Sequence, residues 1–292
     1  MSRKLPFDKQ WIEQTAAKWP TPFHVYDAEA IRANARRLKK AFSWNKGFRE
    51  FFAVKAAPNP YLMKLLKEFD FGSDCSSMAE LVLAEKVGNV GDRIMFTSND
   101  TPAEEFLKAW ELGAVINLDD ITHWDFLVKT LHASLVAPNW SDRIMCCRYN
   151  PGPLKGGNAI IGKPEEAKYG FTRDQLFECY AKMRDAGVKR FGLHTMVASN
   201  ELDPDYIVDT AKMLFTLVGE LHDQLGIDFE FINIGGGIGI PYKPEQKAMD
   251  LEYVGEGIRK AYVELVEKKG MEPIKLYMEC GRCITGPAGS RA

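Results

Sequence analysis

Residues 49–55 read REFFAVK, a short apolar and aromatic run, and a helical pattern follows it from Pro60 to Phe69. The same alternation of a β-rich run with a helix-like segment continues along the chain. Runs of this length and composition are typical of strands buried in a parallel sheet. The seven further strand candidates are Asp70–Asp74, Arg93–Thr97, Ala114–Leu118, Arg143–Tyr149, Arg190–Thr195, Phe229–Ile234 and Ile274–Glu279.

The clearest helix begins at Asp203-Pro204, a capping side chain followed by proline at the first helical position. Its apolar residues recur at three- and four-residue steps and share one face, which needs a sheet to cover. They are Ile207, Ala211, Leu214, Val218 and Leu221. Eight strand–helix units in succession predict an α/β fold, a (β/α)8 barrel of the TIM type. A doubly wound open sheet is the alternative, and the count of eight favours the barrel.

The chain divides into residues 1–44, an N-terminal strand and helix, and residues 45–292, the barrel itself. Thr21–Tyr26 reads as the strand and Ala28–Phe42 as the helix. Such a strand needs a pairing partner outside the barrel, and the sequence offers no obvious one. After Glu279 the chain runs GRCITGPAGSRA, a glycine-rich loop that looks unfinished. We therefore expect the chain to be part of a longer protein.

The composition is that of an ordinary soluble globular protein, with 46% hydrophobic and 27% charged residues among 292. A net charge of -2 argues against a nucleic-acid or anionic-membrane partner. No segment approaches the ~20 apolar residues needed to span a bilayer, and no apolar stretch of a secretory signal follows the N-terminus. By elimination we expect a cytoplasmic protein.

Two of the six cysteines, Cys280 and Cys283, have CxxC spacing. A zinc site would need a second pair or nearby histidines, and none follows them. We therefore expect no metal here, and two packed thiols instead.

Three features at predicted strand ends suggest chemistry, because active sites of such barrels lie at the C-terminal ends of the strands. Lys55 ends an apolar strand, where a disfavoured ammonium form would leave an amine able to form a Schiff base. Gly235-Gly236-Gly237 can bring backbone N–H groups onto a phosphate. Glu279 could keep a pyridine nitrogen protonated, and Arg282 could bind phosphate.

Each feature also has a structural interpretation. Lys55 could be a surface lysine, the glycines a tight turn, and Glu279 and Arg282 an ion pair. The functional interpretation depends on all three occurring together in barrel order.

Together these residues resemble the fold-type III pyridoxal-phosphate decarboxylases, the alanine-racemase-like barrel group, and within it the diaminopimelate decarboxylases most closely. The similarity covers nearly the whole chain, and the lysine motif is its most specific part. The matching stretches are Thr21-Pro22 with Val25–Asp27, Phe52–Ala56 with Pro58-Asn59, Gly72–Ser77 with Glu80-Leu81, Arg148–Gly152, Lys168–Gly170, Ile234–Gly237 and Glu279–Arg282.

The resemblance implies pyridoxal 5'-phosphate as cofactor, Lys55 as its Schiff-base partner and Glu279 as the ring-nitrogen partner. It implies phosphate binding by Gly235, Gly236, Gly237, Ser199 and Arg282, with Asp74 and Glu80 as polar residues around the cofactor. The implied activity is decarboxylation of a small amino acid, foremost meso-diaminopimelate to L-lysine and CO2 in lysine biosynthesis. Ornithine, arginine and carboxynorspermidine are alternative substrates, and the full-length form is expected to be a homodimer.

The chain departs from the family at two points. The family stacks a histidine on the cofactor ring, where this sequence has Met196, and His194 lies two residues earlier on the same strand face. His194 is a candidate substitute or a core histidine, and a methionine can also pack on an aromatic ring.

The second departure is that the family continues into a C-terminal β-domain, which supplies a catalytic cysteine and a tyrosine, and this sequence does not reach it. A non-catalytic pyridoxal-phosphate-binding protein is therefore the alternative function. A racemase is a weaker one, because racemases of this fold tend to place arginine at the ring nitrogen.

Overall fold

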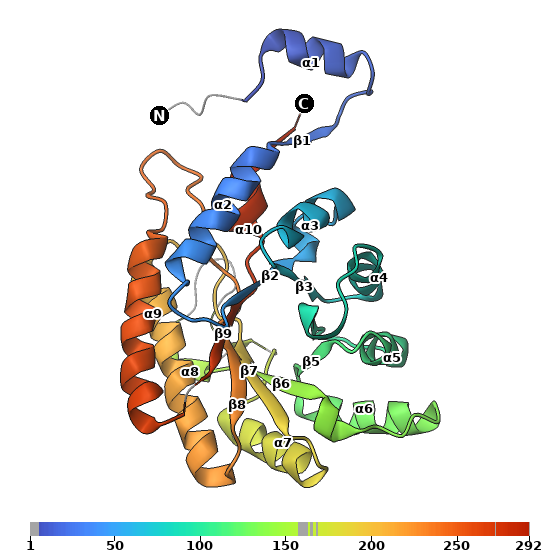
Figure 1. Cartoon of the computed structure of the whole chain (residues 1–292), viewed down its shortest axis with the longest axis vertical. Helices are drawn as coiled ribbons and strands as arrows, with labels where there is room; N and C mark the ends of the chain where they lie inside the picture. The colour runs from blue at the N-terminus through green and yellow to red at the C-terminus, as the bar shows by residue number, and fades with distance from the viewer. Residues whose placement is uncertain (1–5, 157–162, 164–165, 168, 272, 292) are drawn as a thin grey trace.

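The structure, a computed structural model, describes residues 6–156, 163, 166–167, 169–271 and 273–291. Eight parallel strands, β2 to β9, form a closed barrel in chain order, and β9 pairs with β2 to close it (Figure 1). This confirms the predicted barrel and excludes the open sheet. The strands are β2 (Arg49–Ala53), β3 (Gly72–Cys75), β4 (Ile94–Thr97), β5 (Val115–Leu118), β6 (Ile144–Tyr149), β7 (Arg190–Thr195), β8 (Phe229–Asn233) and β9 (Lys275–Met278).

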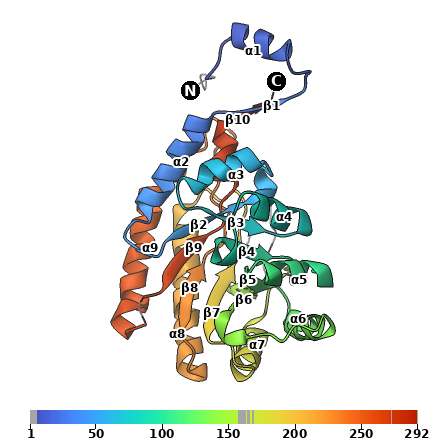
Figure 2. The same cartoon turned by 45° about the vertical axis from the view of Figure 1, so that its right-hand side comes forward.

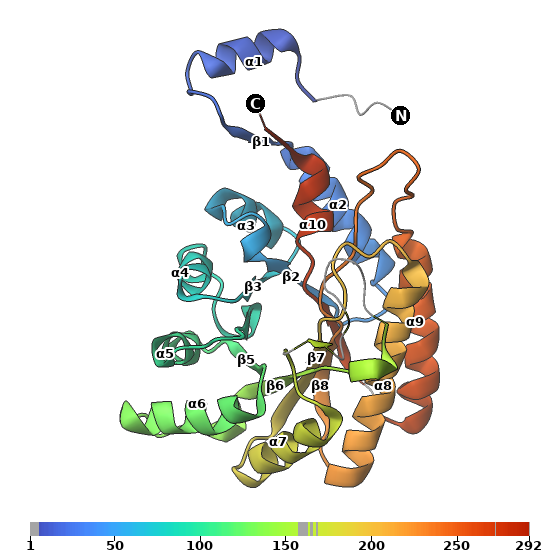
Figure 3. The same ribbon diagram turned by 180° about the vertical axis from the view of Figure 1, so that it is seen from behind.

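Helices surround the barrel, and one of them comes from before the first barrel strand. Helix α2 (Ala28–Ala41) packs against α3 on one side and α9 on the other, and so completes the ring (Figure 2). The helix that follows β9, α10 (Arg282–Thr285), is short and lies against α2 (Figure 3). The other ring helices are α3 (Pro60–Lys67), α4 (Met78–Lys86), α5 (Ala103–Glu111), α6 (Ile121–Ala133), α7 (Arg173–Asp185), α8 (Pro204–Leu225) and α9 (Leu251–Leu265).

Local sequence sets the ends of these helices. Asp203 caps α8 by accepting the N–H of Asp205 at 3.0 Å, and Gly226 ends the helix in the left-handed conformation at φ +63°. Asp27 caps α2 by accepting the N–H of Ala30 at 3.0 Å.

The barrel interior changes from apolar to polar along the strands. One end is filled by Phe51, Met95, Val115, Ile144, Cys146, Phe231 and Tyr277. Two residues further along a strand the side chain faces the same side, and there the buried side chains are polar. Examples are Thr97, Asn117, Asn233 and Glu279. The polar layer thus lies toward the C-terminal ends of the strands, where the predicted site residues are.

The N-terminal strand has a partner in this chain, so the expectation of none was wrong. Strand β1 (His24–Tyr26) pairs antiparallel with β10 (Gly289–Arg291), with Val25 opposite Ser290. The predicted glycine-rich loop after Glu279 therefore contains a helix and a strand. The β1–β10 ribbon and α1 (Lys9–Ala16) project from one end of the barrel (Figures 1 and 2).

The close packing of α2 on α9 predicts the effect of one substitution. A Cβ added to Gly255 in α9 would lie 2.1 Å from the carbonyl oxygen of Ala41 at the end of α2. We expect Gly255→Ala to lower the free energy of unfolding by about 1–3 kcal/mol, because the helices must separate. Thermal denaturation followed by circular dichroism measures this.

Gly219→Ala in α8 is the matched control. There the added Cβ meets only the flexible ends of Lys269 and Met271, at 3.2 and 3.7 Å. This variant should be neutral or more stable by up to ~1 kcal/mol, because alanine favours helix. Equal losses of unfolding free energy in both variants would contradict the close packing of α2 on α9.

Candidate functional site

A pocket of about 440 Å³ opens at the C-terminal end of the barrel, between segments that follow β2, β7, β8 and β9. Six of the predicted site residues line it: Lys55, Met196, Ser199, Gly237, Glu279 and Arg282. The other predicted residues, Asp74, Glu80, His194, Gly235 and Gly236, are not part of its lining. The roles of all eleven residues remain predictions.

Lys55 lies in a 3-10 turn, Val54–Ala56, directly after β2. Its side chain is exposed toward the pocket and not enclosed by apolar side chains, so the expected apolar environment is wrong. Its positive charge lies close enough to Asp74 and Glu279 to favour their ionised forms. The carboxylates of Asp74 and Glu279 therefore lie near this amine.

Glu279 follows β9, and its carboxylate is buried. Oε2 lies 2.9 Å from Nε2 of His194, and Oε1 accepts a hydrogen bond from Nδ2 of Asn233 at 2.7 Å. Burial alone would raise the pKa of Glu279, but His194, Lys55 and Asn233 together lower it. Glu279 therefore stays an anion at the wall of the pocket.

His194 is 1% exposed and contacts Glu279 from inside the barrel. Its Nδ1 has no hydrogen-bond partner in the described part of the chain. It is not among the residues that line the pocket, and its Nε2 contacts the carboxylate of Glu279. Its role toward a cofactor remains a prediction.

Asp74 and Glu80 differ in environment. Asp74, in β3, is buried, and its burial and the nearby charge of Glu279 raise its pKa well above the usual range. Glu80, in α4, accepts the backbone N–H of Ser76 at 2.8 Å, which orders the turn after β3. Asp74 is thus close to the charged groups of the pocket, whereas Glu80 holds local structure.

The glycine turn after β8 has no room for side chains. A Cβ on Gly235, Gly236 or Gly237 would lie 2.3, 2.2 or 2.6 Å from a backbone oxygen of a neighbouring segment. Gly235 and Gly237 also have positive φ, +73° and +99°. The turn therefore brings its backbone to the pocket wall, as expected for a loop that approaches a ligand closely.

Met196 and Arg282 both line the pocket and make hydrogen bonds to neighbouring segments. The thioether sulfur of Met196 accepts the N–H of Gly236 at 3.4 Å. Nη1 of Arg282 donates to the hydroxyl of Tyr242 at 2.9 Å. Tyr242 also lines the pocket and was not predicted.

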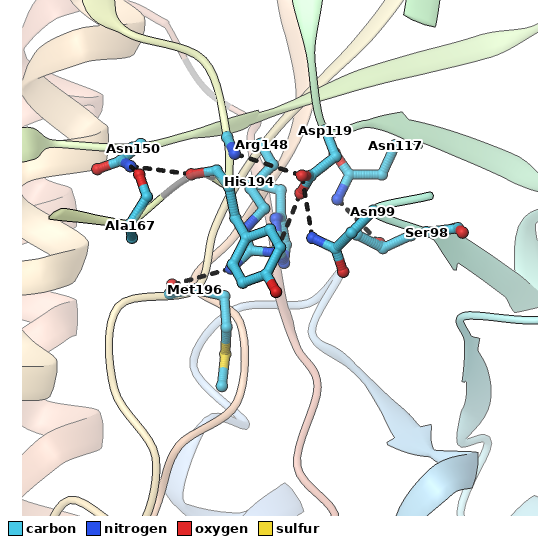
Figure 4. Close-up of polar contacts among 12 residues, drawn as sticks. Ser98, Asn99, Asn117, Asp119, Arg148, Asn150, Ala167, His194 and Met196 are labelled. Carbon is cyan, nitrogen blue, oxygen red and sulfur yellow. Dashed lines mark hydrogen bonds and ion pairs between the residues drawn. The ribbon is translucent and has the colours of Figure 1, made fainter. Parts of the chain in front are cut away.

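A second charged network lies at the barrel mouth, contributed by β5, β6 and their neighbours (Figure 4). Arg148 pairs with Asp119 at 3.0 Å, and its other amino group donates to the carbonyl of Met196 at 3.4 Å. Asn99 donates to the second oxygen of Asp119 at 2.9 Å. The network therefore holds the backbone of Met196, while its sulfur contacts Gly236.

Sequence reasoning missed Asn233, Tyr242 and the Asp119–Arg148 pair. Asn233 was visible as a polar residue inside an apolar strand, two positions before Gly235. Arg148 was noted as a family match without a role, and Tyr242 carried no signal. Of the matching stretch Lys168–Gly170, Lys168 lies outside the described residues.

The chemistry of these groups fits a phosphorylated pyridine aldehyde. The pocket offers an amine at Lys55, an anion at Glu279, and a crowded glycine turn beside Ser199 and Arg282. An amine can bind an aldehyde, a carboxylate can pair with a protonated ring nitrogen, and backbone N–H groups with a guanidinium suit phosphate. The pocket volume is also in the usual range for such ligands.

Comparison with known proteins agrees with this fit. The family model "Pyridoxal-dependent decarboxylase, pyridoxal binding domain" matches residues 28–286. Protein TabA of Pseudomonas amygdali pv. tabaci is 35% identical, and the diaminopimelate decarboxylase of Methanothermobacter thermautotrophicus 31%. These matches cover 95% and 94% of this chain, which spans 63% of the length of each relative.

Solved structures show the same fold. Diaminopimelate decarboxylase of M. jannaschii with L-lysine superposes with a TM-score of 0.84 at 24% identity, over 94% of this chain and 64% of that one. Lysine decarboxylase of Selenomonas ruminantium gives 0.81 at 20% identity, over 99% and 70%. The chain therefore belongs to the pyridoxal-dependent decarboxylase family and contains its pyridoxal-binding domain, with pyridoxal phosphate as cofactor.

Proposed function

We propose that the protein decarboxylates an amino acid, foremost meso-diaminopimelate, to give L-lysine and CO2 in lysine biosynthesis. The observation that carries this proposal is the convergence of Lys55, Glu279, Gly237 and Arg282 on one pocket. The family membership makes decarboxylation the reaction to test first.

The protein's own residues would position and stabilise, while the bound cofactor supplies an electron sink for the bond that breaks. Lys55 would hold the cofactor covalently through Nζ. Glu279, kept ionised by His194 and Asn233, would hold a proton on the ring nitrogen. Ser199, Gly237 and Arg282 would anchor the phosphate, and Met196 would pack on the ring face.

The preference for meso-diaminopimelate rests on similarity to diaminopimelate decarboxylases. Ornithine, arginine and carboxynorspermidine are the alternatives. We also place the protein in the cytoplasm and expect the full-length form to be a homodimer. Along the described residues, no helix has the length and apolar character that crossing a membrane requires.

One observation favours a second candidate, a non-catalytic pyridoxal-phosphate-binding protein. Met196 takes the position where the resemblance to the family implies a histidine, and a thioether cannot exchange a proton during a reaction. The carboxylate at Glu279 favours the decarboxylase, because a protein that only binds the cofactor has no need of a protonated ring nitrogen.

Release of labelled CO2 separates the two. The native full-length protein should release CO2 from carboxyl-labelled meso-diaminopimelate faster than from ornithine or arginine. A protein that binds the cofactor but releases CO2 from none of these amino acids would be the non-catalytic binder.

Replacing the pocket lysine tests the covalent attachment. Lys55→Ala should remove the absorbance of covalently bound cofactor and lower turnover by at least about a hundredfold, because no other amine of the pocket lining can replace it. Absorbance spectra of the protein with pyridoxal phosphate measure this. Lys64→Ala, on the exposed face of α3, is the control and should keep the spectrum. Retention of the covalent absorbance by Lys55→Ala would refute the assignment.

Asn233→Asp tests whether Glu279 must be ionised. The carboxylate of Glu279 loses its charge as pH falls through its pKa, which the amide of Asn233 helps to keep low. A second carboxylate beside it would raise that pKa. We expect the acidic limb of the kcat/KM profile to move to higher pH by about one unit.

Asn89→Asp is the matched control for this charge change. Asn89 is also buried, but its amide donates to the hydroxyl of Ser73 at 2.8 Å. The acidic limb of the kcat/KM profile of Asn89→Asp should stay in place. An unmoved limb in Asn233→Asp as well would show that ionisation of Glu279 does not limit the reaction.

A further inference from the structure

A group of reactive side chains lies behind the pocket wall and is not used by the proposed function. It consists of Glu50, Cys280 and Cys283, which we call the dithiol cluster. Cys280 is 1% exposed, whereas Cys283 is half-buried. Cys283 lines a groove of about 700 Å³ between α2, α10 and residues 238–249, so one thiol is accessible and the other is not.

The two cysteines lie three residues apart, Cys280 after the end of β9 and Cys283 at the start of α10. The hydrogen-bonding contact with Cys283, followed by burial, raises the pKa of Cys280 well above its usual range. Two cysteines at this spacing around a helix start can reach disulfide geometry.

Glu50 is the acid–base group of the cluster. It lies in β2 and is 1% exposed. One carboxyl oxygen accepts the backbone N–H of Cys280, and the other has no hydrogen-bond partner in the described ranges. Burial raises the pKa of Glu50 well above its usual range. A carboxyl group with such a pKa can exchange a proton with a neighbouring thiol.

The dithiol cluster does not have the ligand set of a metal site. Among the described residues, no three His, Cys, Asp or Glu side chains come together as a metal site. One accessible thiol, one buried thiol and a buried carboxyl group instead match the parts of a thiol–disulfide exchange site.

We propose that Cys283 and Cys280 are a redox-active pair that closes to a disulfide by exchange with a small anionic disulfide. Cys283 gives its thiol proton to solvent, and the resulting thiolate attacks one sulfur of that molecule, whose S–S bond breaks and releases one thiolate. Cys280 passes its proton to Glu50 and attacks the sulfur of Cys283, which releases the second thiolate. The two released thiolates take up one proton from solvent and one from Glu50. The protein thus loses two electrons and two protons, and the small disulfide is reduced to two thiols.

The anionic character of the partner follows from Arg37. Its exposed side chain lines the same groove as Cys283 and offers a positive charge to a carboxylate-bearing molecule. Oxidised glutathione, which carries carboxylates, is therefore the probe.

Formation of the Cys280–Cys283 disulfide would disturb the cofactor pocket, a consequence that rests on the proposed function. The disulfide would bracket Gly281 and Arg282, which both line the pocket. Gly281 packs tightly beside the Lys55 turn, because a Cβ there would lie 2.5 Å from Cβ of Ala56. We therefore expect oxidation to weaken cofactor binding.

The chain contains a matched control pair, Cys147 and Cys179. Their sulfur atoms are 3.8 Å apart, and both side chains are completely buried. A hydrophilic oxidant cannot reach them, so they should stay reduced under conditions that close the Cys280–Cys283 pair.

The test is peptide mapping of the native protein after incubation with oxidised glutathione. We expect a Cys280–Cys283 disulfide, seen as a peptide about 2 Da lighter than its reduced form, with Cys147 and Cys179 free. Cys283→Ser should form no adduct, and Cys280→Ser or Cys280→Ala should stop at a glutathione adduct on Cys283. In Glu50→Gln the Cys280–Cys283 disulfide should form at least about tenfold more slowly.

Three outcomes would overturn the proposal or part of it. A glutathione adduct on Cys283 that never closes in the unsubstituted protein overturns the pair, as does equal oxidation of Cys147 and Cys179. Unchanged pyridoxal-phosphate affinity after closure overturns the link to the pocket. Because Lys55→Ala must form the same disulfide, failure of the redox site is distinguishable from failure of the proposed function.

Discussion

The buried carboxylate of Glu279 is the interaction on which the rest of the site depends. It is an anion in the interior of a barrel, where an unpaired charge would be very unfavourable. His194 and Asn233 each occupy one of its oxygens, and the charge of Lys55 lies on the open side. The polar layer of the barrel is therefore organised around one negative charge that stays exposed to the pocket.

Asn233 extends this organisation to the glycine turn. Its amide nitrogen donates to Glu279, while its carbonyl oxygen accepts the N–H of Gly235 at 2.9 Å. One side chain thus fixes both the anion and the start of the turn. Because Gly235–Gly237 also touches the backbone after β7 and β9, a shift of either end of the pocket would disturb the other.

The sequence allowed the barrel and the strand ends to be predicted, but not the long-range partners. Lys55, Gly237 and Glu279 were found because each follows an apolar run, and the ends of parallel strands meet on one side. Strand β10 was missed because Gly289–Arg291 is three residues long and has no apolar pattern. The contacts of Glu279 with His194 and Asn233 span 85 and 46 residues, and no local propensity encodes them. Lys55 was placed correctly, but its surroundings were misjudged, because the carboxylate neighbours come from other strands.

The contacts of Met196 show how the pocket wall could hold either a methionine or the histidine that the resemblance to the family implies. Its backbone carbonyl is bound by Arg148, and its sulfur accepts the N–H of Gly236. The first contact does not depend on the side chain, and the second needs only an acceptor, which an imidazole nitrogen can also provide. The Asp119–Arg148 network and the glycine turn would therefore hold either residue at the same place. Because a thioether does not titrate, the ionisable side chains that line the described pocket are Lys55, Tyr242, Glu279 and Arg282.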